Sequence, residues 1–350
     1  MKRIISIFIA AFLLISVLMT ACTQNESGTQ GAASGNANGN NTDGGTTIKI
    51  VATIFPQYDW VREILGDNAD DTELTLLLNN RIDLHNYQPS VEDIMKISNC
   101  DLFIYVGGES DDWVDDVLKN ALNPDMIVLN LMDALGDSVK YEEIIEGMEH
   151  DDDDHDDDDD DDDHDDDDDH DQEYDEHIWL SLRNTEILTL FIADALSDLM
   201  PVHTQAYKAN TTAYNQKLQA LDEEYKSAVN TAAVETLLFA DRFPFRYFVD
   251  DYGLSYYAAF SGCSAETEAS FSTIIFLANK ADELGLKNIM VTECSDKKIA
   301  ETVISNSNDK QRKIFVLDSM QSVTTADVQN GTTYLGIMQS NLEILKEALT

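Results

Sequence analysis

Residues 48–66 read IKIVATIFPQYDWVREILG, and this stretch sets the pattern that the rest of the chain repeats. Its first part is an apolar, partly alternating run, which predicts a β-strand. Its second part places apolar side chains such as Trp60 and Ile64 at helical spacing and closes on Gly66, a good residue for a helix C-cap. A strand followed directly by an amphipathic helix is typical of a parallel sheet covered by helices.

The same alternation continues along the chain. Further strands are predicted at residues 73–78, 101–106, 126–129, 236–240, 254–259, 288–292 and 313–317. Further helices are predicted at residues 91–97, 110–121, 184–199, 270–283, 296–305 and 334–348. About 300 residues carry this pattern, which is enough for two cores rather than one. We therefore expect an α/β fold of two Rossmann-like lobes with parallel sheets.

One predicted helix is much longer than the others. Residues 204–229 keep a single apolar stripe that includes Tyr207, Leu218 and Val229. At about 1.5 Å per residue this helix would span roughly 40 Å. We interpret residues 201–230 as the one rigid connection between an N-terminal lobe at 48–200 and a C-terminal lobe at 231–350.

The amino-terminal segment indicates export and anchoring. Residues 1–21 have a basic start, an apolar run and a small-residue cleavage site, which predicts a signal peptide. The next residue is Cys22, placed as in a bacterial lipobox, so we expect it to be lipidated. Residues 22–47 are rich in Gly, Asn, Ser and Thr and predict a flexible tether. The folded part should then lie at the cell surface, anchored by lipid to the outer face of the cytoplasmic membrane.

The strongly negative net charge of the chain limits the kinds of partner that it can bind. The formal net charge is −45, and residues 151–171 alone contain 18 aspartates. A nucleic-acid partner is unexpected because phosphate binding needs a basic face. We interpret residues 149–172 as a disordered surface loop that collects cations weakly. Its histidines, which fit no helical face, would be the weak ligands: His150, His155, His164 and His170.

Two of the three remaining histidines follow strand-like or apolar runs, at the mouths of loops. His85 lies in the segment 83–90, and His177 lies in the segment 175–180. Neutral imidazole is the commonest protein ligand for divalent metals. We predict that these two side chains meet on one metal ion and that the chain is an extracellular metal-capture protein.

Cysteines offer no obvious metal site. Beyond Cys22 the chain has Cys100, Cys263 and Cys294, and none of them forms a CxxC spacing. One disulfide is possible in an oxidising compartment, but we favour buried free thiols.

Three motifs together resemble a known family. They are VATIFPQYDWV at residues 51–61, YQPS at residues 87–90 after His85, and HIWL at residues 177–180. They are similar to the zinc/manganese solute-binding lipoproteins of ABC importers, the ZnuA/TroA-like cluster. The resemblance covers residues 48–350, and the acidic, histidine-bearing insertion is similar to the zinc-type branch.

The resemblance implies a periplasmic-binding-protein-like fold of TroA type, with the metal in the cleft between the lobes. It implies ligands at His85, His177 and Asp318, the last of these at the end of the final strand. The family's third ligand stands ten residues before a Tyr-Gly-Leu, and here that position is Arg242. A guanidinium has no lone pair to offer, so Arg242 cannot be a ligand.

Three alternatives could fill this third ligand position. Asp241 and Glu266 are candidate carboxylate replacements, and a water molecule beside three protein ligands is the remaining option. Zn²⁺ is the expected ion, with Mn²⁺ as the alternative if oxygen ligands dominate.

The expected function is capture of this ion, without catalysis, and delivery to a cognate ABC permease by a monomeric protein. Two other functions remain open: a surface zinc buffer or adhesin, in which the acidic loop is the active part, and a metal-dependent hydrolase. The hydrolase is disfavoured because the chain has no HExxH-type motif.

Overall fold

The computed structural model describes residues 47–79, 83–149, 173–264 and 268–350. Several predictions fall outside the described residues. They concern the signal peptide, nearly all of the tether, Cys22, Glu266 and the histidines of the acidic loop.

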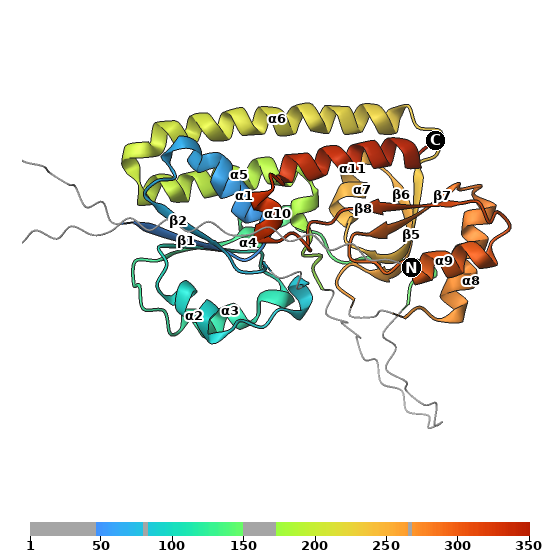
Figure 1. Ribbon diagram of the computed structural model, residues 1–350, viewed down its shortest axis with the longest axis horizontal. Helices are drawn as coiled ribbons and strands as arrows, with labels where there is room; N and C mark the ends of the chain where they lie inside the picture. Colours follow the sequence, from blue (N-terminus) through green and yellow to red (C-terminus); the bar gives the residue numbers. More distant parts are fainter. Residues whose placement is uncertain (1–46, 80–82, 150–172, 265–267) are drawn as a thin grey trace, which may run out of the picture. The chain divides into compact units, whose positions relative to one another are not determined.

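The first sheet is fully parallel, with the strand order β2-β1-β3-β4. Its strands are β1 (Ile48–Ala52), β2 (Thr72–Leu76), β3 (Leu102–Tyr105) and β4 (Ile127–Asn130). The helices that follow these strands are α1 (Phe55–Leu65), α2 (Val91–Ser98), α3 (Trp113–Leu118) and α4 (Leu131–Leu135), and α5 (Leu182–Leu199) comes later in the chain. Together these elements form the N-terminal lobe (Figure 1).

The second sheet repeats this architecture with the order β6-β5-β7-β8, again parallel throughout. Its strands are β5 (Thr236–Phe243), β6 (Ser255–Ser261), β7 (Asn288–Thr292) and β8 (Lys313–Leu317). Its helices are α7 (Arg246–Tyr252), α8 (Phe271–Glu283), α9 (Lys298–Asn306), α10 (Thr325–Gln329) and α11 (Tyr334–Ala348). The predicted α/β class with two parallel-sheet lobes is therefore confirmed.

The long helix α6 (Thr204–Asn230) has 27 residues, as the apolar stripe predicted. Its buried face, which includes Tyr207, Leu218 and Tyr225, packs against α1, α5 and α11. The Tyr225 hydroxyl donates to the carbonyl of Met338 at 2.5 Å, which ties α6 to the C-terminal lobe. None of the helices in the described ranges combines the length and the apolar character needed to cross a membrane.

Contacts between the lobes do not depend on α6 alone. The indole N–H of Trp179 donates to the carbonyl of Ser319 at 2.9 Å, and the Tyr334 hydroxyl donates to the carbonyl of Trp179 at 2.7 Å. The backbone N–H of Tyr334 donates to buried Asp59 of α1 at 2.8 Å. One apolar core runs from the first sheet into the second lobe, and a smaller core lies under α8 and α9. The two lobes are thus held together by their own packing.

One predicted helix is shorter than expected. The sequence predicted a helix at 110–121, but the structure has a 3₁₀ turn at Glu109–Asp111 followed by α3 at Trp113–Leu118. The carboxylate of Asp111 accepts the backbone N–H groups of Val106 and Gly107, both at 3.0 Å. These two bonds hold the chain back against the end of β3 as a 3₁₀ turn, and the regular helix begins only after it, at Trp113.

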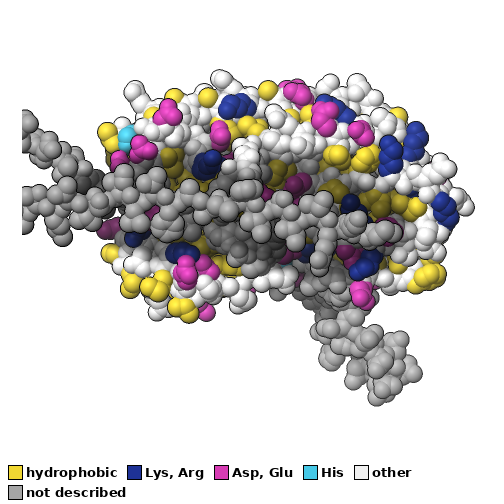
Figure 2. Space-filling model, in the orientation of Figure 1, with side chains coloured by type: hydrophobic (Ala, Val, Ile, Leu, Met, Phe, Trp, Pro, Cys, Tyr) yellow, Lys and Arg dark blue, Asp and Glu magenta, His cyan; other side chains and the backbone are white. Residues whose placement is uncertain are grey.

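Acidic and basic side chains share the surface. On the face drawn in Figure 2, Lys and Arg side chains are interspersed with Asp and Glu among the described residues that are visible, and these visible residues form no continuous basic area.

Candidate metal site

His85 is positioned by a short turn after β2. The turn is a 3₁₀ helix at Leu84–Asn86, and the side chain of Asp83 caps it by accepting the backbone N–H of His85 at 3.2 Å. Aspartate is well suited to this capping position because its carboxylate satisfies a free N–H group. The side chain of His85 is only 9% exposed.

His177 lies immediately before the 3₁₀ turn Ile178–Leu180 and is fully buried. One oxygen of Asp175 accepts both its backbone N–H, at 2.8 Å, and its ring Nδ1, at 3.0 Å. The ring is therefore held at two points by the same carboxylate.

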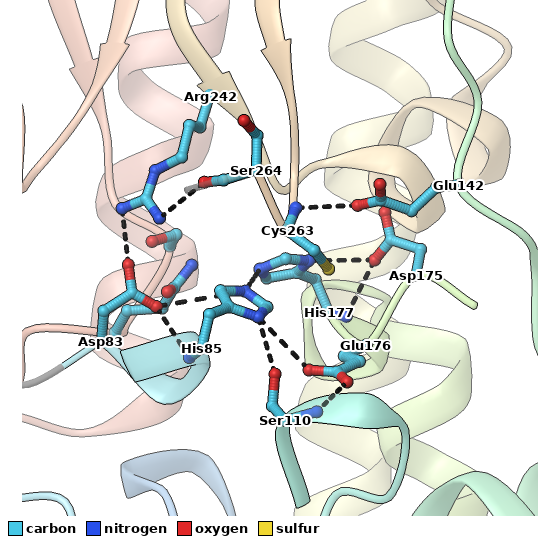
Figure 3. A network of polar contacts seen from close by, with 12 residues as sticks. Asp83, His85, Ser110, Glu142, Asp175, Glu176, His177, Arg242, Cys263 and Ser264 are labelled. Carbon is cyan, nitrogen blue, oxygen red and sulfur yellow. Dashed lines mark hydrogen bonds and ion pairs between the residues drawn. The ribbon is translucent and has the colours of Figure 1, made fainter. Parts of the chain in front are cut away.

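The two imidazoles converge (Figure 3). The distance between His85 Nε2 and His177 Nε2 is 3.3 Å, and the ring centroids are 5.2 Å apart. Two nitrogens bound to one tetrahedral zinc ion at about 2.0–2.1 Å lie about 3.3–3.4 Å apart. The structure thus brings the two predicted histidines together at the spacing that such an ion requires.

The opposite ring nitrogens have partners that orient the lone pairs. His85 Nδ1 lies 2.8 Å from Ser110 Oγ and 3.4 Å from a Glu176 carboxylate oxygen. Nδ1 of His177 faces Asp175, as described above. Assigned from these partners, both rings carry hydrogen on Nδ1 and turn a free Nε2 lone pair toward the same point. Carboxylate partners of this kind are typical of metal-binding histidines.

Glycine at position 108 makes room for one of these partners. Gly108 has φ +86°, and a Cβ added there would collide with the Glu176 side chain. The other Glu176 oxygen accepts the backbone N–H of Ser110 at 2.8 Å. Gly108 therefore allows Glu176 to reach both His85 and Ser110.

The two histidines differ in basicity. Burial, reinforced by the neighbouring His177, lowers the pKa of His85 to about 3. Burial also acts to lower the pKa of His177, but Asp175 outweighs it, so the pKa of His177 is raised above 6.5. Of the two rings, His177 is therefore the one that takes up a proton more readily, and a proton on its Nε2 would face the His85 lone pair.

The charge of Arg242 is paired with Asp83 beside the site, although it still contributes to the lowered pKa of His85. It lies in β5, where the strand register is irregular between Phe239 and Arg242, and its guanidinium pairs with the carboxylate of Asp83 at 2.5 Å. This ion pair joins the C-terminal lobe to the His85 turn (Figure 3). Although burial acts in the opposite sense, Arg242 holds the pKa of Asp83 below its usual value.

The predicted carboxylates lie elsewhere. One oxygen of Asp241 accepts the backbone N–H and the hydroxyl of Thr292, at 2.9 and 2.8 Å, and the other accepts the N–H of Arg242, so this side chain ties β5 to β7. Asp318 follows β8 as predicted, and it accepts the N–H of Met320 at 2.7 Å. Burial, with help from Glu293, raises the pKa of Asp318 to about 7.

Asp318 also lines a cavity of about 340 Å³ that is formed with the start of α11. Within the described residues, neither Asp318 nor Asp241 belongs to a group of ligand atoms with the two histidines. Their assignment as ligands stays a prediction.

A residue that the sequence did not single out lies at the site instead. Among the described residues, His85, His177 and Cys263 are the group whose potential ligand atoms all lie within 4.8 Å of one another. Cys263 follows β6, which pairs with β5, so its loop leaves the sheet at the same edge as Arg242. This strand adjacency was the available signal, because neighbouring parallel strands end at one edge. Cys100, Cys263 and Cys294 are all free, as predicted, but of the three thiols expected to be buried only Cys100 is: Cys263 is partly buried and Cys294 is exposed.

The chain matches known proteins over nearly all of its described length. Residues 50–348 match the model of a family described as zinc-uptake complex component A, periplasmic (ZnuA). The zinc-binding lipoprotein AdcA of Streptococcus pneumoniae is 29% identical over 300 residues, which are 86% of this chain and 55% of that protein. The high-affinity zinc uptake system protein ZnuA of Bacillus subtilis is 28% identical over 322 residues, which are 91% of this chain and 93% of that protein. The chain spans about half the length of the first curated relatives it matches, the streptococcal AdcA proteins.

Solved structures share the fold. The Zn(II)-bound ZnuA-like domain of Streptococcus pneumoniae AdcA is 25% identical, with a TM-score of 0.64 over 87% of this chain and 99% of that one. The periplasmic zinc-binding protein TroA of Treponema pallidum is 21% identical, with a TM-score of 0.66 over 87% of this chain and 99% of that one. At this identity TroA bears on the fold alone, which agrees with the two parallel-sheet lobes.

Proposed function

Because this chain belongs to the ZnuA family of zinc-uptake complex components, we propose that it captures a zinc ion between His85 and His177 and delivers the ion to an ABC permease. The family is one of uptake components rather than of enzymes, so the hydrolase alternative is disfavoured. The zinc-binding names of the relatives support zinc as the cargo.

The observation that carries this proposal is the 3.3 Å separation of the two Nε2 atoms. The segments that bear them are 92 positions apart in the chain, and each has its own carboxylate partner at Nδ1. Two largely buried imidazoles whose Nε2 lone pairs face each other repel, so without an ion one ring must carry a proton between them. A divalent cation satisfies both lone pairs at once.

Asp318 remains a proposed carboxylate ligand, carried over from the family resemblance. Its oxygen is now engaged with Met320, so binding would require its side chain to turn toward the histidines. Ligands drawn from both lobes would let the metal favour a modest closing motion, which the permease reads. The packing between α1, α6 and α11 limits the size of that motion.

We also propose that Cys22 is lipidated and holds the monomeric protein at the outer face of the cytoplasmic membrane. The lipoprotein name of the pneumococcal relative supports this placement. The acidic tract at residues 149–172 would then collect zinc weakly. A surface zinc buffer or adhesin is the alternative, and deletion of residues 151–171 separates the two, because zinc uptake persists without the tract only if His85 and His177 carry the function.

The test is zinc titration of the full chain against a competing chelator, which sets free zinc low enough that the acidic tract stays unoccupied. We expect one tightly bound ion in the unmodified protein. His85→Ala and His177→Ala should each abolish this stoichiometric binding, because each removes half of the imidazole pair.

His203→Ala is the matched control, since this histidine lies in the 3₁₀ turn Pro201–His203 at the start of α6, outside the site. It should bind zinc like the unmodified protein. Unchanged one-to-one binding in both His85→Ala and His177→Ala would contradict the proposed function.

A further inference from the structure

Cys263 lies where the metal needs a third protein ligand. We propose that its thiolate is that ligand and that it replaces the donor which the family carries at the position of Arg242. This inference rests on the proposed function, because it names a further ligand of the same ion. On binding, a sulfur–metal bond forms and the thiol proton passes to the buffer.

The distances allow this bond with little movement. One ring nitrogen of His85, one of His177 and the sulfur of Cys263 lie within 4.8 Å of one another, and the two Nε2 atoms are 3.3 Å apart. For Zn–S near 2.3 Å and Zn–N near 2.0–2.1 Å, a tetrahedral ion places sulfur about 3.6 Å from each nitrogen. From the 4.8 Å limit, a sulfur shift of about 1 Å toward such a nitrogen reaches this distance, and a three-ligand site then leaves a fourth position for a water molecule or a carboxylate.

Two features hold the Cys263 loop against His177. The backbone N–H of Cys263 donates to a carboxylate oxygen of Glu142 at 2.7 Å, which fixes the loop to the N-terminal lobe. Gly262, the preceding residue, lies so close to His177 that an added Cβ would stand 3.1 Å from ring atom Cε1. Glycine here brings the backbone, and with it the Cys263 side chain, up to the ring (Figure 3).

Other nearby donors are already engaged. Arg242 has no lone pair and is paired with Asp83, whose second oxygen caps the His85 turn. Both oxygens of Asp241 accept hydrogen bonds from backbone or Thr292 groups. Cys263 forms no disulfide, and its thiol faces the carboxylate of Glu142, a hydrogen bond that can be exchanged for a bond to the metal.

This ligand set also distinguishes between metals. Two neutral imidazoles and one thiolate carry a single negative charge, and they are soft or borderline donors. Such a set suits Zn²⁺ and disfavours Mn²⁺, which prefers carboxylate, carbonyl and water oxygens. The site would therefore select zinc over manganese, the ion that the sequence left as an alternative.

The test uses Co²⁺ as a spectroscopic probe of the full chain. All samples carry Cys22→Ser, so that the remaining thiols are Cys100, Cys263 and Cys294. We expect one tightly bound Co²⁺ with the near-ultraviolet charge-transfer band of a thiolate–cobalt bond. Cys263→Ser should lose this band, and its zinc affinity should fall about 100-fold, because even partners outside the ligand set cost 10- to 100-fold.

Cys294→Ser is the matched control. Cys294 lines the small cavity beside Arg242 but lies outside the three-atom group, so the band should persist. A second measurement does not depend on any variant: bound Zn²⁺ should protect Cys263 from alkylation, read by mass spectrometry, while Cys294 keeps its reactivity.

The remaining outcomes overturn the inference in distinguishable ways. One tightly bound Co²⁺ without the band, or a band lost in Cys294→Ser, rejects Cys263 as the ligand and leaves zinc capture by the histidines intact. Absence of any tight Zn²⁺ or Co²⁺ binding in the reference protein rejects the proposed function and this inference together.

Discussion

The two walls of the candidate metal site are built differently. The N-terminal wall presents His85 and His177, each with a carboxylate at its Nδ1 atom. The C-terminal wall presents Arg242, whose charge is taken up by Asp83, and the free thiol of Cys263. The first wall has its donors aligned before any ion arrives, whereas the second offers one donor that must shift to reach it.

The contrast suggests different roles for the two walls: the histidines of the N-terminal wall orient the ion, whereas the ligand on the C-terminal wall can be replaced by another residue. Carboxylate-backed imidazoles need several supporting residues, so changing them would disturb the whole wall. A single donor on the opposite wall can be moved from one strand to its neighbour, because parallel strands end at the same edge. The proposed use of Cys263, one strand away from Arg242, in place of the third ligand that the family resemblance implies fits this reasoning.

The largest expected effect is on pH dependence. His177 must release its proton to bind zinc, and its pKa is raised above 6.5 because the effect of Asp175 exceeds that of burial. Below that pKa the proton competes with zinc, and above it the ring is neutral, so affinity falls as the pH is lowered. His85, whose pKa burial lowers to about 3, stays neutral and does not compete.

Burial, with Glu142, raises the pKa of the Cys263 thiol, so its thiolate adds a second released proton. Below the pKa of His177, zinc affinity should thus fall about 100-fold per pH unit in the unmodified protein and about tenfold in Cys263→Ser. Chelator competition between about pH 5.5 and 7.5, corrected for chelator protonation, measures both slopes. If zinc affinity changed equally steeply with pH in the unmodified protein and in Cys263→Ser, Cys263 would not be releasing a proton on binding, and the proposed role of the C-terminal wall would be wrong.

A smaller effect is expected for Asp175→Asn, which weakens the N-terminal wall. The variant keeps the shape of the side chain but loses the charge that orients and polarises His177. Zinc affinity should fall about 10- to 100-fold. Asp116→Asn, the same change at an exposed residue of α3 that pairs with Lys119, should leave the affinity unchanged. If the zinc affinity of Asp175→Asn were unchanged, the Asp175 carboxylate would not be what positions the His177 ring.

The smallest effect is expected for Arg242→Met, which changes the C-terminal wall. Removing the guanidinium leaves the negative charge of Asp83 near the ion, so zinc affinity should rise by less than about tenfold. Arg246→Met is a close control, because Arg246 is 23% exposed against 21% for Arg242 and also pairs with a carboxylate, that of Glu143. A large loss of affinity in Arg242→Met alone would show that the ion pair with Asp83 assembles the site.

Much of the fold could be predicted from the sequence because it depends on local periodicity. The long helix α6 begins at the predicted residue, Thr204, and ends one residue past the predicted end. The helix expected at 110–121 was predicted less well. A carboxylate–backbone contact at Asp111 decides how the chain turns there, and such a contact has no periodic signal.

The sequence by itself determined the alternating strands and helices, the two histidine loops and the unsuitability of Arg242 as a ligand, because these follow from side-chain pattern and chemistry. The tertiary structure alone decided that Arg242 turns to Asp83 and that Cys263 approaches His177. The physical reason is that both outcomes depend on strand order and on loops meeting across two lobes. Distances between side chains that are far apart along the chain are set by packing rather than by spacing in the sequence.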